Sequence, residues 1–109
     1  MTKIKILKND GNFVGFVVKG HSGYAESGND LVCASISILV YTVLNSLNEV
    51  AGVAEEDMDV NIDEKKGFTS LKLKKVDYST EVVFNVFIVG ITMLTESYSD
   101  YVTLMFEEV

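Results

Sequence analysis

The sequence predicts one α+β domain spanning 1–109, with two helices packed on a mostly antiparallel sheet. The elements follow the order ββαββαβ, and in each of the two ββ units a short turn joins the two strands. Hairpins that alternate with helices are typical of this fold class. Hydrophobic residues make up 48% of the 109 residues, which is enough for one core, and no linker, repeat or low-complexity segment divides the chain.

Residues 1–19 are expected to form an antiparallel hairpin. Apolar residues including Ile4 and Leu7 lie among lysines in the first strand, and "FVGFVVKG" forms the second. Between them, "KNDGN" centres on Asp10-Gly11, a dipeptide that favours a tight hairpin turn.

Apolar residues recur at helical spacing after residue 30 and predict the first helix. Asn29 or Asp30 suits its N-cap, and Gly52 is the expected stop. The residues expected on its buried face are Ile36, Val40, Val43, Leu44, Leu47, Val50 and Ala51.

A second hairpin is expected from "MDVNIDE" and "FTSLKLKKV", whose apolar residues alternate on either side of the turn "KKG". The next segment, 82–94, predicts a helix capped by Asp77, Ser79 or Thr80, with Glu81 in its first turn. This helix is apolar nearly all round, which indicates either a homodimer interface or a deep core position. "YVTLMFEEV" is expected to close the chain as a strand.

The composition weighs against several function classes. The formal net charge is −7, so the chain repels phosphate and direct nucleic-acid binding is not expected; a basic protein or peptide is the better partner. The N-terminus has no apolar run of signal-peptide length, and the stretches 36–44 and 82–94 are shorter than the roughly 20 residues that span a bilayer. We therefore expect a cytoplasmic protein without a membrane partner, and the single cysteine allows no internal disulfide.

The chain's only histidine and only cysteine, His21 and Cys33, lie on either side of one glycine-bearing segment. If Asp30 caps the helix, Cys33 is its third residue, where a helix N-terminus stabilises a thiolate and offers backbone N–H groups to an oxyanion. Gly20 and the two glycines of the segment, Gly23 and Gly28, permit positive φ angles or movement. A Cys-His nucleophile is one interpretation; a small buried cysteine, a structural histidine and simple turn glycines are the alternative.

No cofactor is indicated by these residues. A structural zinc site needs four cysteine or histidine ligands, and the chain has one of each, so we expect no metal.

The stretch "GHSGYAESGNDLVCASIS", residues 20–37, resembles the signature of the ribosomal-processing cysteine protease family, Prp. Length and element order agree as well, so the resemblance covers essentially the whole chain. Ser22 departs from the family, which often has alanine there. The matching residues are Gly20, His21, Gly28, Asp30, Leu31, Val32, Cys33, Ala34 and Ser37.

The resemblance implies a cysteine endopeptidase that removes the N-terminal extension of large-subunit ribosomal protein twenty-seven and so supports ribosome maturation. It implies Cys33 as the nucleophile, His21 as the general base and later acid, and Asp30 as a supporting residue. It also implies a homodimer, and a mobile or substrate-binding loop that includes Gly20, Ser22, Gly23, Gly28 and Ser37.

Three other functions stay open from the residues. The chain could be a non-catalytic, dimeric, ribosome-associated interaction module, in which the His21–Cys33 pair is incidental. It could be a thiol redox sensor, although there is no second cysteine to resolve an oxidised Cys33. An RNA-binding protein ranks last, because the lysines of "LKLKK" form only a small basic stripe.

Overall fold

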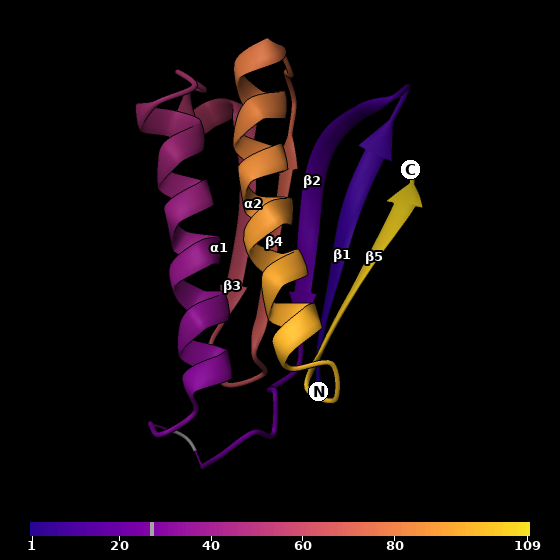
Figure 1. The fold of residues 1–109 in the computed structure, drawn as a ribbon. Helices are drawn as coiled ribbons and strands as arrows, with labels where there is room; N and C mark the ends of the chain where they lie inside the picture. Colours follow the sequence, from indigo (N-terminus) through magenta and orange to yellow (C-terminus); the bar gives the residue numbers. More distant parts are fainter. Residues whose placement is uncertain (27) are drawn as a thin grey trace.

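The structure is a computed structural model that describes residues 1–26 and 28–109. Two helices lie side by side across one face of a five-stranded sheet (Figure 1). The predicted order ββαββαβ is confirmed, with one added 3-10 turn before the third strand. The elements are β1 (Thr2–Asn9), β2 (Asn12–Lys19), α1 (Leu31–Glu49), η1 (Glu55–Asp57), β3 (Met58–Asp63), β4 (Phe68–Leu73), α2 (Tyr78–Ser97) and β5 (Val102–Glu108).

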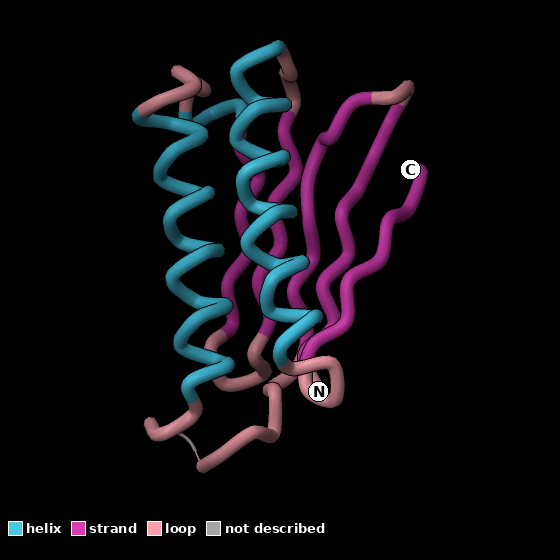
Figure 2. The backbone as a smooth tube through the Cα atoms, viewed as in Figure 1, coloured by secondary structure: helices cyan, strands magenta, loops and turns pink. Residues whose placement is uncertain are grey.

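The sheet has the strand order β3-β4-β2-β1-β5 (Figure 2). Three neighbouring pairs are antiparallel, and only β1 and β5 run parallel, so the predicted mostly antiparallel sheet is confirmed. The two parallel strands are the first and the last of the chain, so all other elements lie between them in the sequence.

The first turn has the geometry that its sequence predicts. Asp10 and Gly11 both have positive φ, 54° and 81°. Two positive φ angles in a two-residue loop match the right-handed twist of the strands it joins. The turn therefore sets the register of β1 against β2, which shifts once, between Leu7 and Lys8.

The core lies between the sheet and the two helices. β1 shows how strand alternation builds it, because Ile4 and Ile6 face the helices with no exposed surface, while Lys3 and Lys5 point to the other side. The buried apolar residues are Ile4, Ile6, Phe16, Val18, Val32, Ile36, Val40, Val43, Leu47, Val53, Leu71, Leu73, Phe84, Phe87, Ile91 and Val102.

Helix α1 begins directly after the predicted cap at Asp30, but it ends before the predicted apolar spacing does. Its first residue is Leu31 and its last is Glu49, so the predicted burial of Val50 is wrong: this C-cap side chain is 77% exposed. Gly52, with φ of +73°, then redirects the chain, and the buried Val53 returns to the core instead. The chain turns at Gly52 as predicted, but the helix ends two residues before the end of the predicted apolar face, which ran to Ala51.

Helix α2 begins with a reciprocal cap. The Asp77 carboxylate accepts from the backbone N–H of Thr80 at 3.0 Å, and the Thr80 hydroxyl oxygen accepts from the N–H of Asp77 at 2.9 Å. Asp77 is thus the cap among the three predicted candidates. Glu81 lies in the first turn as predicted, and its carboxylate accepts from the N–H of Phe13 at 2.8 Å, which ties the helix to β2.

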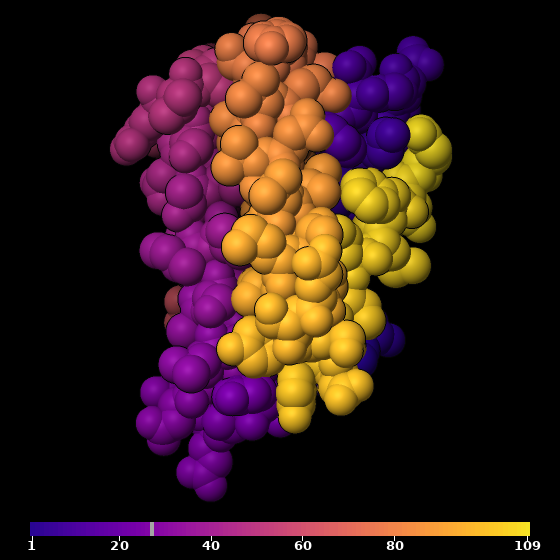
Figure 3. Space-filling model, viewed as in Figure 1, coloured from indigo at the N-terminus to yellow at the C-terminus, as the bar shows by residue number. Residues whose placement is uncertain are grey.

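Only one side of α2 is buried in the chain. Phe84, Phe87 and Ile91 pack on the sheet, but Val86 and Met93 are 66% and 62% exposed. Figure 3 shows α2 running across the middle of this face without another element over it. A deep core position for the whole helix is therefore wrong.

Both helices are longer than the apolar stretches that predicted them. At 19 and 20 residues they are long and apolar enough, by length and composition alone, to cross a membrane. Core helices of globular proteins can be equally long and apolar, and here each helix packs one face against the sheet.

Candidate functional site

The segment between β2 and α1 crosses the end of the helix layer, where β2 ends and α1 begins (Figure 2). Gly20, Gly23 and Gly28 have φ angles of +90°, +74° and +90°, so each adopts the left-handed conformation that glycine permits. Thr2 fixes the start of the segment, because its hydroxyl donates to the Gly20 carbonyl at 3.2 Å.

An aromatic contact holds the middle of the segment. The Tyr24 ring lies edge-on to the rings of Tyr98 and Tyr101, with centroids 5.5 and 5.2 Å away. These two tyrosines come from the connection between α2 and β5. The segment is therefore packed against the far end of the chain.

Cys33 is the third residue of α1, as the expected cap at Asp30 requires. The Asp30 side chain accepts from the backbone N–H of Cys33 at 2.9 Å, which makes Asp30 the N-cap. Cys33 is partly exposed, and its thiol lies in the first helical turn, where the helix dipole favours negative charge.

Asp30 is 9% exposed and accepts further hydrogen bonds, from the Ser22 hydroxyl at 2.5 Å and the N–H of Ala25 at 3.3 Å. Burial acts to raise the pKa of this carboxyl. The hydrogen bonds from Ser22, Cys33 and Ala25 outweigh burial and lower the pKa of Asp30 to about 2. Asp30 is therefore ionised at neutral pH.

Ser22 lies beneath the site and is only 2% exposed. The Cys33 S–H donates to the Ser22 hydroxyl oxygen at 3.4 Å, and the Ser22 N–H donates to the Cys33 sulfur at the same distance. Ser22 thus contacts both the nucleophile candidate and its helix cap.

His21 is exposed, and its Nε2 lies 3.2 Å from the carbonyl oxygen of Lys65. A carbonyl only accepts hydrogen bonds, so Nε2 carries the proton of the neutral ring and Nδ1 is its basic atom. The ring also passes close to the backbone of Gly67: a Cβ there would lie 3.1 Å from His21 Cε1. The turn between β3 and β4 thus positions the imidazole.

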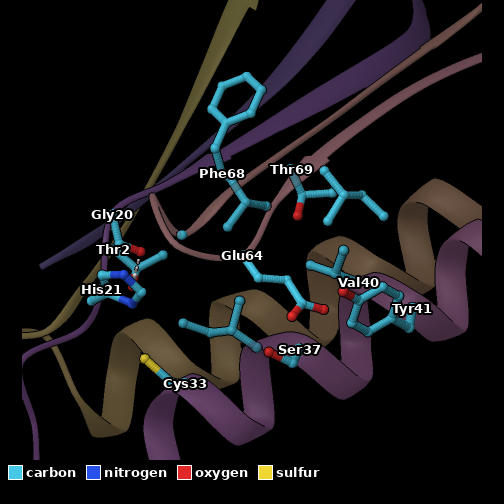
Figure 4. A pocket seen from close by; sticks show the side chains of 14 residues that line it. Thr2, Gly20, His21, Cys33, Ser37, Val40, Tyr41, Glu64, Phe68 and Thr69 are labelled. Carbon is cyan, nitrogen blue, oxygen red and sulfur yellow. Dashed lines mark hydrogen bonds between the residues drawn. The ribbon is translucent and has the colours of Figure 1, made fainter. Parts of the chain in front are cut away.

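The thiol and the imidazole line one cavity of about 270 Å³ between α1 and the β3–β4 hairpin. Figure 4 shows the His21 ring at its end above Cys33, with the Glu64 carboxylate directed toward Ser37 and Tyr41. The wall is mostly apolar further along α1. The lining residues are Thr2, Val18, Gly20, His21, Cys33, Ile36, Ser37, Val40, Tyr41, Ile62, Glu64, Gly67, Phe68 and Thr69.

A second, more polar cavity of about 560 Å³ meets the first at His21, Cys33, Ser37 and Glu64. It extends along the segment between β2 and α1. Its remaining lining residues are Gly23, Ala25, Gly28, Asp30, Ala34 and Lys65. Together the two cavities form an open path past the thiol on both sides, which suits an extended chain more than a compact small molecule.

The structure brings most of the predicted site residues together. His21 and Cys33 share both cavities, Gly20 lines the first, Gly23, Gly28 and Asp30 line the second, and Ser37 lines both. Ser22 lines neither cavity, because it is buried under the thiol.

Two details differ from the expected arrangement. Among the described residues, no hydrogen bond joins the His21 ring to the Cys33 thiol, because each is bonded to another group. Backbone N–H groups at the start of α1 were expected to be available to an oxyanion, but those of Cys33 and Ala34 are bonded to Asp30, at 2.9 Å to its side chain and 3.0 Å to its carbonyl oxygen. The N–H groups of Cys33 and Ala34 are thus engaged by the helix cap in this structure.

The sequence did not single out Tyr41, Glu64, Lys65 or Gly67. They come from the second turn beyond Cys33 and from a hairpin more than 40 residues from His21. Only the pairing of β2 with β4 brings that hairpin to the site, and a register cannot be read from alternation alone. No cluster of three or more His, Cys, Asp or Glu side chains suited to a metal ion occurs within the described residues.

Comparison with known proteins gives one consistent result. Residues 1–103 match the family described as cysteine protease Prp. The ribosomal processing cysteine protease Prp of Mycoplasma genitalium is 32% identical, covering 95% of this chain and 94% of the relative. The Staphylococcus aureus (strain Mu50) protein of the same name is 25% identical, covering 98% and 100%.

Solved structures agree with the fold. The crystal structure of SMU.848 from Streptococcus mutans superposes with a TM-score of 0.85 at 26% identity, covering all of this chain and 96% of the other. The S. aureus Prp in complex with a covalently linked product peptide has a TM-score of 0.83 at 24% identity, covering 98% and 100%.

Proposed function

The chain belongs to the Prp family of ribosomal processing cysteine proteases, and from this premise we propose that Cys33 and His21 cleave its substrate as a catalytic dyad. The substrate we propose is the N-terminal extension of large-subunit ribosomal protein twenty-seven, whose removal supports ribosome maturation. The chain is a cysteine protease by family; the residues and the substrate are the proposal.

One observation carries the dyad: the only histidine and the only cysteine line the same cavity. Eleven residues lie between them in the sequence, and they reach that cavity from a strand end and a helix start. A thiol in the first turn of a helix, an imidazole with a basic Nδ1 and an open path on both sides are what peptide cleavage by a cysteine nucleophile needs.

The proposed reaction proceeds in two steps. His21 takes the proton from Cys33, and the thiolate attacks the scissile carbonyl carbon, forming a C–S bond and an oxyanion. As the oxyanion collapses, the C–N bond breaks and His21 gives the proton to the leaving amine. Water then attacks the thioester while His21 accepts its proton; the C–S bond breaks, the acid is released and the thiol is restored.

The resting hydrogen bonds must rearrange before the first step. The thiol proton is directed to Ser22, and the His21 ring is held at Lys65, so a shift of residues 21–22 is needed to pair the two groups. The same shift would separate Ser22 from Asp30 and loosen the cap that occupies the Cys33 N–H. We propose that a peptide entering the path past the thiol causes this shift.

Charge supports a basic peptide as the substrate. The chain has a net charge of −7, and a carboxylate, Glu64, lines both cavities beside the thiol. The names of the relatives also support a ribosomal protein, since two of them are called ribosomal processing proteases. An acidic enzyme attracts a basic substrate before contact.

We also propose that the protein works in the cytoplasm as a homodimer. The exposed apolar side of α2 supports the dimer, because it is a continuous outward stripe on an element whose other side is in the core. The residues of that stripe are Val82, Val86, Val89 and Met93.

The substrate proposal is tested with purified enzyme and ribosomal protein twenty-seven carrying its N-terminal extension. Mass spectrometry is expected to find one new N-terminus at the end of the extension. The matched control carries the same extension in scrambled order, and it is expected to stay intact because the contacts along the path past the thiol depend on which side chain occupies each position. Equal cleavage of both, or of neither with a correctly folded enzyme, would overturn the substrate.

A further inference from the structure

We propose that Ser22 is a positioning residue that keeps the Cys33 thiol protonated in the resting enzyme until residues 21–22 move. The effect of Ser22 on catalysis rests on the proposed role of Cys33 as nucleophile. The state of the thiol itself can be measured without any substrate, so the proposal can fail or succeed independently of that role.

The Ser22 hydroxyl has no hydrogen-bonding capacity left. A serine hydroxyl offers one donor and two acceptor positions. The donor goes to Asp30 Oδ2 at 2.5 Å, and the acceptor positions take the N–H of Tyr24 at 3.2 Å and the S–H of Cys33 at 3.4 Å. Every position is used, and the thiol meets the oxygen, not the proton, of this hydroxyl.

Asp30 fixes that orientation. Its carboxylate is 9% exposed and ionised at neutral pH, so it continues to accept the hydroxyl proton throughout the working range. A charge-assisted bond of this length is stronger than a bond to sulfur. The hydroxyl therefore does not turn to donate to Cys33, and its lone pairs favour a neutral S–H over a thiolate.

The opposing contact comes from the backbone. The Ser22 N–H donates to the Cys33 sulfur at 3.4 Å and stabilises negative charge there. This bond survives removal of the side chain, so Ser22→Ala takes away the oxygen that accepts the thiol proton, together with the hydroxyl's bond to Asp30. The ionisable groups around the site, His21, Asp30, Glu64 and Lys65, are the same in both proteins.

The position of Ser22 in the chain links thiol release to the base. Ser22 follows His21 directly, so a backbone movement that withdraws the hydroxyl from the thiol also moves the imidazole from its contact with Lys65. One movement would thus free the Cys33 thiol proton from Ser22 and bring the His21 ring toward it as the acceptor. Premature ionisation of the thiol, and its oxidation, are limited until then.

The test is the pH profile of Cys33 alkylation by iodoacetamide, measured with the intact protein. Ser22→Ala is expected to move the midpoint about half a pH unit lower, which is about a threefold higher rate below the midpoint. Ser22→Thr keeps the hydroxyl and is expected to restore the wild-type midpoint. The matched control is Ser35→Ala, because the Ser35 hydroxyl donates to the Leu31 carbonyl at 2.7 Å, away from the thiol.

An unchanged or higher midpoint in Ser22→Ala overturns the proposal, since the hydroxyl would then not favour the protonated thiol. If circular dichroism finds this variant unfolded, the S–H stretching band in the Raman spectrum of the wild type decides. The chain has one cysteine, so the band reports only Cys33. A band lowered to the frequency of a donating thiol is expected, and a band at the frequency of a free thiol contradicts the proposal.

Discussion

At the residue scale, Asp30 has two tasks that its position combines. It caps α1 by accepting from the N–H of Cys33, and it anchors the loop by accepting from Ser22 and Ala25. The pKa of Asp30 is lowered from 3.8 to about 2, so the ionised carboxylate is more stable in the folded protein than in the unfolded chain. Its stabilisation is therefore fully present above about pH 4 and is lost as the pH falls from there toward about 2.

We expect Asp30→Ala to lower the free energy of unfolding by about 1–2 kcal/mol at neutral pH, through the lost cap and loop anchor. The difference from wild type should shrink as the pH falls below about 4, because the wild-type carboxyl then takes up its proton. Urea unfolding at a series of pH values measures it. Asp100→Ala removes an exposed carboxylate instead and should show neither effect; a loss for Asp30→Ala that stays full at low pH would contradict the account.

The residues of the site differ in how far the sequence reveals them. Asp30 and Cys33 were predictable because a cap and the first helical turn are local features of the chain. Ser22 could be placed in the loop, but its role needed three partners that only the folded loop brings together. The contact between His21 and Lys65 crosses 44 positions, and no local pattern contains it.

At the element scale, the pairing of β2 with β4 completes the site. Lys19 lies opposite Phe68 in the register, so the next residues outward, Gly20 and Gly67, meet beyond the strand ends. The Gly20 N–H donates to the Gly67 carbonyl at 3.0 Å. The β3–β4 turn thus forms the wall of the cavity next to His21.

Gly67→Ala is expected to lower activity about tenfold and stability by about 1–2 kcal/mol. Gly67 has φ of +60°, and an added Cβ would lie 3.0 Å from the Gly20 carbonyl oxygen and 3.1 Å from the His21 ring. Peptide cleavage rates and thermal unfolding measure the two effects.

The matched control for this substitution is Gly11→Ala, which has φ of +81° but nothing within 4 Å of the added Cβ. It should lose stability and keep full activity. Equal activity losses in both variants would mean that strain, not displacement of His21, is responsible.

The elements themselves were largely predictable, and their ends were not. Asp10-Gly11 identified the first hairpin because few other dipeptides accept two positive φ angles. The end of α1 was misplaced because Val50 continues the apolar spacing although the chain has already left the helix. The exposed side of α2 was ambiguous because Val86 and Met93 look like core residues in sequence.

At the scale of the whole molecule, the order of the strands was out of reach. β5 lies beside β1 in parallel, at the opposite edge from β3, and nothing in its alternation selects that neighbour. The charge, in contrast, follows from composition alone: 16 acidic residues against 9 basic ones give the net charge of −7.

That charge gives a prediction about salt. We expect kcat/KM for a basic peptide to fall several-fold as salt rises, while kcat changes little, because screening shortens the Debye length from about 10 Å at about 0.1 M to about 3 Å at about 1 M. Steady-state kinetics at a series of salt concentrations measure it. The same peptide with its lysines replaced by glutamine is the control and should respond weakly; equal responses would exclude steering by charge.

The central claim, that Cys33 and His21 act together on a peptide bond, is tested most directly by cleavage of one synthetic peptide that spans the extension and its junction. Wild type, Cys33→Ala, His21→Ala and the control Ser35→Ala would be compared by mass spectrometry, with folding verified for each. We predict cleavage at one bond by the wild type and the control, and none by the other two. Cleavage at the wild-type rate by either Cys33→Ala or His21→Ala would contradict the claim.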